Sequence, residues 1–264
     1  MMMNVNRRYL CAAAGWLTAF ALWTAAVSRL DVRQIGPRGS AVGLAALNAW
    51  VHRLTGVHMT LYYITDWLGL VPVAVACGFA ILGLVQLIRR KSLLRVDRSI
   101  LLLGGFYIIV LTAYLLFETV VINYRPVLIE GRLEASYPSS TTILVLCVMP
   151  AAMLQLRSRV KDGRLRRTII RAMAAFTVFM VVGRTLSGVH WFSDIAGGIL
   201  LSCGLVALYA AVSGLPAAAG PQLDDANSAD TATEDNINEI SGYQRDDHRS
   251  LDRRGLAVGD PDQP

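Results

Sequence analysis

The chain has 264 residues, of which 54% are hydrophobic and only 17% are charged. A soluble domain of this size carries about a quarter charged residues, so the composition excludes an ordinary soluble protein and indicates a surface that largely faces lipid. The net charge of +6 hides an asymmetry, because residues 214–264 hold 11 acidic and 4 basic residues while the rest of the chain holds 21 basic and 8 acidic ones. Basic residues between apolar segments are typical of cytoplasmic loops, and this explains the basic body better than nucleic-acid binding does.

Six apolar segments are long enough to cross a bilayer, for which about 20 residues are needed. They predict an all-α, polytopic membrane bundle, and they lie at residues 9–28, 61–88, 99–121, 142–156 with its flanks, 169–186 and 195–212. A signal peptide is the alternative for the first segment, but its length favours a retained helix. The segment 41–56 is apolar but contains His52 and Arg53, which predicts an interfacial or re-entrant helix.

Two short basic loops set the predicted orientation. Residues 89–98 join the second and third segments, residues 157–167 join the fourth and fifth, and both stretches are rich in arginine. Short basic loops stay in the cytoplasm, so both chain termini are expected inside a cell membrane, with loops 122–141 and 187–194 on its outer face. The loop 29–60 also contains four arginines, which opposes this orientation, but it is longer than the others.

Three parts of the chain are expected to differ in structure. Residues 1–60 hold the first transmembrane helix and an outer loop with the interfacial helix, and residues 61–213 form the membrane core. Residues 214–264 are rich in Asp, Asn, Ser and Thr and show no apolar period. Such a segment cannot bury enough apolar surface to offset its ordering entropy, so we expect a disordered cytoplasmic tail.

The predicted outer loops hold ionisable residues that membrane burial does not explain. Arg184, His190 and Asp194 lie close together in the sequence, at the junction of the last two segments. Ionisable groups at membrane depth are costly and indicate function by default; the alternative is an interfacial cluster whose members satisfy one another. Asp194 follows His190 by about one helical turn, so its carboxylate can accept the imidazole Nδ1–H and leave Nε2 as a free lone pair. This is how a nucleophile is activated.

Further polar residues on the same face suit a phosphate. Arg125 and Arg184 carry planar guanidinium groups that match phosphate oxygens. Ser139 and Ser140 open the fourth segment, where unpaired backbone N–H groups and the helix dipole favour an anion. Together with a histidine oriented by an aspartate, these residues predict phosphoryl transfer through a phosphohistidine.

The pattern resembles the type 2 phosphatidic acid phosphatases, a family that shares its fold with the vanadium-dependent haloperoxidases. The family's third motif is Ser-Arg-x5-His-x3-Asp. It is matched here by Arg184, His190 and Asp194 with the spacing fully kept, although Gly183 stands at the serine position. The resemblance covers roughly residues 60–213 and makes this region a phosphatase-like membrane core.

The other two family motifs, Lys-x6-Arg-Pro and Pro-Ser-Gly-His, are matched only in part. Arg125 and Pro126 match the first, but Glu118 stands at the lysine position. Residues 138–140 match the start of the second, but Thr141 stands at the histidine position.

The resemblance implies a role for each matched residue. It makes His190 the nucleophile and Asp194 its orienting partner, and it assigns the phosphoryl group to Arg125, Arg184, Ser139 and Ser140. Family members usually remove phosphate from lipid phosphates or prenyl diphosphates without a metal, so no cofactor is expected. The implied function is a hydrolase of lipid metabolism that acts on a membrane lipid. A lipid phosphotransferase is one alternative, and a degenerate member that binds phospholipid head groups without turnover is another.

The two departures bear on activity. In the family, the second-motif histidine protonates the leaving oxygen, and Thr141 cannot supply that proton near neutral pH. Loss of a general acid typically costs ~10²–10⁴ in rate, and it costs least where the leaving group is already a weak base. Thr141 therefore predicts a preference for lipid diphosphates. Glu118 allows three interpretations. Its negative charge opposes phosphate binding unless it pairs with an arginine. Alternatively, burial raises its pKa and the protonated carboxyl serves as the missing acid, or the residue has no catalytic role.

Overall fold

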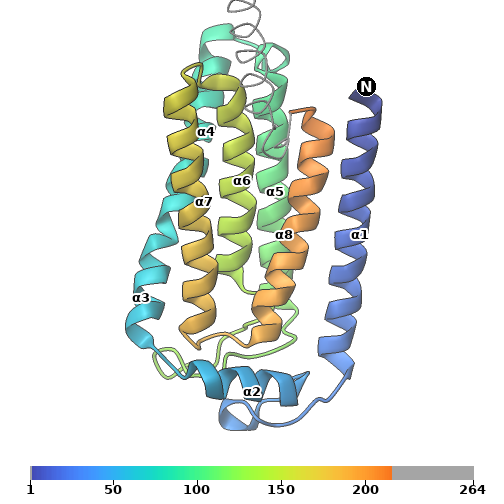
Figure 1. The fold of residues 1–264 in the computed structure, drawn as a ribbon, viewed down its shortest axis with the longest axis vertical. Coiled ribbons are helices and arrows are strands. Elements are labelled where there is room, and N and C mark those ends of the chain that lie inside the picture. The colour runs from blue at the N-terminus through green and yellow to red at the C-terminus, as the bar shows by residue number, and fades with distance from the viewer. Residues whose placement is uncertain (1, 216–264) are drawn as a thin grey trace, which may run out of the picture. The chain divides into compact units, whose positions relative to one another are not determined.

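Eight α-helices dominate the part of the chain that the computed structural model describes, residues 2–215 (Figure 1). They are α1 (Met2–Arg29), α2 (Ala45–Thr55), α3 (Met59–Leu68), α4 (Leu70–Arg90), α5 (Arg98–Thr119), α6 (Ser140–Arg159), α7 (Gly163–Leu186) and α8 (Phe192–Ser213), with short 3-10 turns at Pro37–Gly39 and Leu93–Arg95. The predicted disordered tail lies, from residue 216 onward, outside the described residues.

Six helical segments within residues 2–215 are long and apolar enough to cross a membrane. They are Asn6–Arg29, Met59–Arg90, Arg98–Thr119, Ser140–Arg159, Gly163–Leu186 and Phe192–Ser213. The chain is therefore an all-α, multi-pass membrane protein, and the predicted fold class and number of spans are confirmed. The second span differs in detail, because α3 and α4 meet at Gly69, where the predicted helix was continuous.

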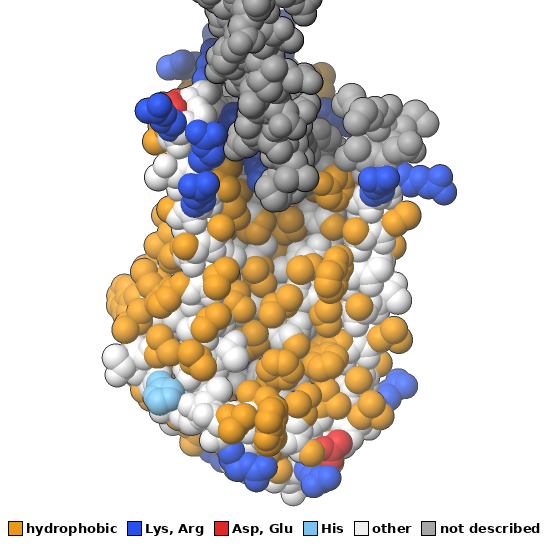
Figure 2. All heavy atoms as spheres, in the orientation of Figure 1, with side chains coloured by type: hydrophobic (Ala, Val, Ile, Leu, Met, Phe, Trp, Pro, Cys, Tyr) orange, Lys and Arg blue, Asp and Glu red, His pale blue; other side chains and the backbone are white. Residues whose placement is uncertain are grey.

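The surface of the bundle carries a broad apolar band between basic groups at its two ends (Figure 2). Large aliphatic side chains on four different spans are more than half exposed: Leu22, Ile81, Ile108 and Val178. Exposed aliphatic surface of this extent is what a lipid-facing belt requires. Charged residues avoid the belt because their desolvation in hydrocarbon is unfavourable.

The core of the bundle lies around α6 and α8, the two most buried spans. Phe106 of α5 stacks on Tyr209 of α8 with ring centroids 4.9 Å apart, and Gln155 of α6 donates a 2.7 Å hydrogen bond to the Tyr209 hydroxyl. On the far side of α8, Gly204 leaves room for Leu17 of α1, because a Cβ there would lie 2.7 Å from the leucine side chain. Small residues at such crossings allow membrane helices to pack closely.

One end of the bundle is closed by loops and by α2, which lies across the helix ends (Figure 1). The loop that joins α5 to α6 and the short turn between α7 and α8 meet at this end. The basic segments 89–98 and 157–167 lie at the ends of α4, α5, α6 and α7 that point away from it. The predicted separation of the ionisable cluster from the basic loops is therefore present in the fold.

Candidate active site

The loop between α5 and α6 folds back on itself as an irregular hairpin. The backbone N–H of Arg125 donates to the Glu134 carbonyl at 3.1 Å, and that of Ser136 donates to the Asn123 carbonyl at 2.9 Å. This pairing places residues 123–125 beside residues 134–136, although eight residues lie between the two arms. The hairpin thereby presents Arg125 and Ser136 together.

The turn between α7 and α8 depends on Gly188. Its φ of +66° is in the left-handed region, and a Cβ at this position would lie 1.8 Å from the Gly56 carbonyl oxygen. Only glycine combines this conformation with such a close approach. The tight turn directs His190 inward, where the residue is 5% exposed.

His190 contacts both arms of the hairpin. Its Nε2 lies 3.3 Å from an Nη of Arg125, and its Nδ1 lies 3.0 Å from the hydroxyl of Ser136. The Asp194 carboxylate is 4.0 Å from Nδ1, and Ser136 donates a short hydrogen bond to it. The predicted direct bond from histidine to aspartate is thus replaced by a bridge through Ser136. The prediction treated both residues as helical, but His190 precedes the helix, which begins at Phe192.

The Asp194 carboxylate is fully buried and accepts four hydrogen bonds. Asn123 Nδ2 and the Ser193 hydroxyl donate to Oδ1 at 3.1 and 3.2 Å. The backbone N–H of Trp191 donates to Oδ2 at 3.0 Å, beside Ser136. A buried carboxylate is tolerated only when its lone pairs are satisfied in this way.

A second layer of polar contacts fixes these donors. Asn48 of α2 donates to the Ser193 hydroxyl at 2.9 Å and accepts from its backbone N–H at 3.0 Å. The side-chain oxygen of Asn123 accepts from the backbone N–H of Gly43 at 3.2 Å. The segment before α3, which the sequence placed outside the core, therefore supports Asp194.

The electrostatic surroundings keep the His190 ring neutral. Burial lowers the pKa of His190 well below its ordinary value of 6.5, and the positive charges of Arg125 and Arg184 lower it further. A neutral imidazole at physiological pH retains one nitrogen lone pair, which a nucleophile requires.

Arg125 is the arginine that accompanies His190. Its Nε lies 3.0 Å from a carboxylate oxygen of Glu134, which itself is partly exposed. The carboxylate occupies one edge of the guanidinium and leaves an Nη directed at the histidine ring.

Arg184 is held differently, by α3. Its guanidinium is 3.1 Å from an Asp66 oxygen and 3.2 Å from the Thr65 hydroxyl. Both arginines lie near the Tyr62 ring, with Arg184 4.8 Å and Arg125 6.0 Å from its centroid. The two predicted phosphate ligands are therefore neighbours, but Arg184 already has an acidic partner.

A polar cavity of ≈ 270 Å³ opens beside the histidine. Four predicted residues line it: Glu118, Arg125, Ser140 and His190. Ser136, Tyr114, Phe117, Glu134, Ala135, Tyr137, Pro138 and Ile143 complete its wall. The cavity is the place where a ligand can meet both His190 and Arg125.

Four predicted site residues are not part of that wall. Arg184 and Asp194 lie behind it, as described above. Ser139 is fully buried before the first turn of α6, and its hydroxyl accepts a 3.0 Å hydrogen bond from Thr142. Thr141 lines a different cavity.

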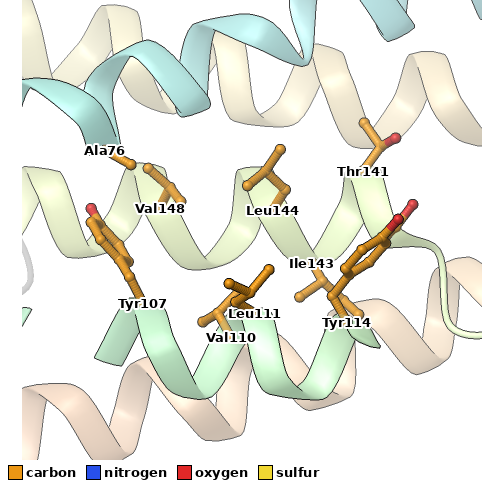
Figure 3. A pocket seen from close by; sticks show the side chains of 10 residues that line it. Ala76, Tyr107, Val110, Leu111, Tyr114, Thr141, Ile143, Leu144 and Val148 are labelled. Carbon is orange, nitrogen blue, oxygen red and sulfur yellow. The ribbon is translucent and has the colours of Figure 1, made fainter. Parts of the chain in front are cut away.

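That second, apolar cavity of ≈ 360 Å³ lies between α4, α5 and α6 (Figure 3). Figure 3 shows aliphatic side chains such as Leu144 and Val148 facing it from α6, with Tyr107 and Tyr114 at its two ends. Tyr114, Ser140 and Ile143 line both cavities. The polar cavity therefore adjoins an apolar space between membrane helices, and these three residues are common to both walls.

The proton donors near His190 are limited. The Tyr137 hydroxyl is bonded to Thr24 of α1 at 2.7 Å, and burial raises the pKa of Tyr137 to about 12. Such a phenol does not give up its proton near neutral pH. Glu118 lies on the same wall and is exposed.

Sequence reasoning missed several residues that organise the site. Ser136 and Asn123 contact His190 and Asp194 directly, whereas Tyr62 and Asp66 hold Arg184. Ser136 and Asn123 each stand two residues before a matched motif, which is the one sequence signal that points to them. Within residues 2–215, no group of three or more His, Cys, Asp or Glu side chains is placed to bind a metal ion.

Comparison with known proteins gives one structural match. No protein-family model matches the chain, and no curated protein matches its sequence. Among solved structures, the chain is similar to a transmembrane PAP2-type phosphatidylglycerolphosphate phosphatase from Bacillus subtilis, with 16% sequence identity and a TM-score of 0.49. The match covers 76% of this chain and 94% of that one.

Proposed function

We propose that this chain is a membrane lipid phosphatase or diphosphatase of the type 2 phosphatidic acid phosphatase kind, with His190 as its nucleophile. One observation carries the proposal: His190 Nε2 and the Arg125 guanidinium, 3.3 Å apart, lie at a polar cavity that adjoins an apolar space between helices. A phosphate on a hydrocarbon chain suits both parts, because the chain and the anion need surroundings of opposite polarity.

The proposed reaction has two steps. The Nε2 lone pair of His190 attacks phosphorus, and the bond from phosphorus to the leaving oxygen breaks with its electron pair on that oxygen. Arg125 stabilises the charge that develops on the phosphoryl oxygens. Ser140 and the backbone N–H groups at the start of α6 are proposed as further donors. Water then attacks phosphorus, and the electron pair of the N–P bond returns to Nε2.

Ser139, Arg184 and Asp194 take supporting roles in this proposal. Asp194 orients the histidine through Ser136. Arg184 adds positive potential from behind Tyr62, and direct contact with phosphate requires its guanidinium to leave Asp66. Ser139 supports the first turn of α6, where its backbone N–H donates to the Asp194 carbonyl at 3.0 Å.

The substrate preference follows from Thr141, which faces the apolar cavity and supplies no acid. A phosphate that leaves from a diphosphate is a weaker base than an alkoxide that leaves from a monoester. We therefore propose a lipid diphosphate, such as a polyprenyl diphosphate, as the preferred substrate. Equal turnover of phosphatidic acid and a prenyl diphosphate by the purified protein contradicts this preference.

The orientation is proposed from the charge distribution. The basic segments 89–98 and 157–167 lie at the end of the bundle opposite His190, and short basic loops stay in the cytoplasm. Both termini are then cytoplasmic, and the cavity faces the outer side of a cell membrane.

A phosphate-release assay on a panel of lipid phosphates and diphosphates tests the function. We expect release by the wild type, loss of about 10³-fold or more in His190→Ala, and near-normal release in His58→Ala, which alters an exposed histidine outside the cavity. A phosphorylated protein trapped by rapid quenching is expected to be stable to alkali and labile to acid. Release that survives His190→Ala refutes the phosphohistidine mechanism.

One observation favours a second candidate, a protein that binds lipid head groups without turnover. Glu118 and Glu134 both line the polar cavity, and their negative charges oppose a phosphate. Absence of release from every substrate, together with saturable binding of phospholipid vesicles, supports this candidate. Transfer of phosphate to an added lipid alcohol in place of water indicates a phosphotransferase.

A further inference from the structure

Ser136 occupies a position between the two residues that matter most to the proposed reaction. It is 3% exposed, and its hydroxyl contacts both His190 Nδ1, at 3.0 Å, and an oxygen of Asp194. Asp194 and His190 are 4.0 Å apart at their nearest atoms. The interaction between them therefore passes through the serine hydroxyl.

The protons and lone pairs that each group carries determine the direction of these hydrogen bonds. A serine hydroxyl has one proton, and an ionised carboxylate only accepts, so the proton of Ser136 goes to Asp194. The hydroxyl oxygen is then an acceptor for His190, and Nδ1 must carry the proton.

The contact at Nε2, on the other side of the imidazole ring, independently indicates the same tautomer. Arg125 approaches Nε2 to 3.3 Å, and a guanidinium has donors but no acceptor. Nε2 therefore presents its lone pair. Both contacts of the imidazole select the tautomer that is protonated on Nδ1 and nucleophilic at Nε2.

We propose that Ser136 is a positioning residue, which holds His190 in its nucleophilic tautomer and transmits the charge of Asp194 to the ring. The kinetic part of this inference rests on the proposed function, whereas the tautomer is a property of the resting protein. When Nε2 bonds to phosphorus, Nδ1 keeps its proton and the ring becomes positively charged. Ser136, polarised by its bond to Asp194, stabilises that charge, which is lost again when the N–P bond breaks.

The first test reads the tautomer directly. In ¹⁵N-histidine-labelled protein, the imidazole nitrogen shifts distinguish a protonated from an unprotonated nitrogen, and His190→Gln identifies the signals of this ring among the four histidines of the chain. We expect protonated Nδ1 in the wild type and in Ser136→Thr, which keeps the hydroxyl. In Ser136→Ala only the contact with Arg125 still favours this tautomer, so we expect part of the population to shift to the tautomer that is protonated on Nε2. An unchanged tautomer in Ser136→Ala overturns the proposal.

The second test is kinetic. Ser136→Ala is expected to lower kcat about 10- to 100-fold, with KM changed less than about twofold, because the phosphate contacts remain. Ser136→Thr is expected to recover most of the lost kcat. The matched control is Ser202→Ala, a buried serine of α8 that does not line the polar cavity. An equal loss of kcat in Ser202→Ala, or no loss in Ser136→Ala, overturns the positioning role.

The two tests distinguish a failure of the proposed function from a failure of the proposed role of Ser136. If the wild type releases no phosphate, the proposed function fails, but the nitrogen shifts still decide whether Ser136 sets the tautomer. If Ser136→Ala does not fold, Ser136→Cys carries the same measurements, because a thiol keeps the volume but is a weak donor and acceptor.

Discussion

The two walls of the polar cavity are built in different ways. On the wall formed by the α7–α8 turn, His190 is buried. Behind it, the buried Asp194 carboxylate accepts hydrogen bonds from Ser136, Asn123, Ser193 and Trp191. On the wall formed by the end of α5, Glu118 is exposed and carries a negative charge. The first wall is supported by a dense hydrogen-bond network, whereas the second is open to solvent. The orientation of His190, the proposed nucleophile, is thus more tightly constrained than the part of the cavity proposed to bind the anion.

The largest expected effect comes from a substitution of Asp194, the carboxylate at the centre of the hydrogen-bond network. Asp194→Asn replaces a charged acceptor by an amide that also donates, and it leaves at least one of its four donors without an acceptor. We expect kcat to fall by ~10²–10⁴, with a lower unfolding temperature. Steady-state phosphate release and thermal unfolding in the same detergent measure both effects. A loss below about tenfold means that Asp194 does not orient His190.

The next effect distinguishes the two arginines. Arg125→Ala is expected to weaken inhibition by inorganic phosphate about 10- to 100-fold, since Arg125 lines the cavity. Arg184→Ala is expected to act mainly on stability, because its partners are Asp66, Thr65 and the Tyr62 carbonyl. The inhibition constant for phosphate and the unfolding temperature of each variant check this assignment. A larger effect of Arg184→Ala on phosphate affinity shows that its guanidinium moves into the cavity.

A smaller effect is expected from a positive charge at position 118, at the end of α5. Glu118→Lys removes a negative charge and adds a positive one near the phosphate, and each change is worth about 0.7 kcal/mol at a separation of ~6 Å in water. We expect phosphate to bind roughly tenfold more tightly. The matched control is Glu130→Lys, which makes the same change in an exposed loop residue that does not line the cavity. Equal gains in both variants indicate a general surface effect and contradict a local role for Glu118.

The smallest expected effect is a pH dependence of the free energy of unfolding, which arises from His190. The pKa of His190 is lower in the folded protein than its ordinary value of 6.5, so below pH 6.5 the unfolded chain binds a proton that the folded one does not. The stability contributed by neutral His190 is therefore present above pH 6.5 and is lost as the pH falls toward the folded pKa, by at most about 1.4 kcal/mol per pH unit. Unfolding temperatures between pH 7 and 5 should decline less steeply in His190→Gln than in the wild type.

Hydropathy was sufficient to predict the six spans, because lipid exposure demands long apolar segments and little else. The break between α3 and α4 at Gly69 escaped prediction, since both helices are apolar and form one span. At the site, motif spacing indicated His190, Asp194 and Arg125. It did not indicate Ser136, because the position of that serine depends on backbone pairing within the α5–α6 loop. It also did not reveal that Asp66 holds Arg184, since 118 residues separate the two.

The polar cavity adjoins the apolar one at Tyr114, Ser140 and Ile143, and this has a consequence for how the protein meets its proposed ligand. A head group that reaches His190 along the apolar space arrives by diffusion in the plane of the bilayer. The concentration that governs the encounter is then the mole fraction of ligand among the membrane lipids, and not its amount per volume of solution. For the proposed reaction, we therefore expect that added inert lipid slows turnover at a fixed amount of substrate, because it dilutes the substrate in two dimensions.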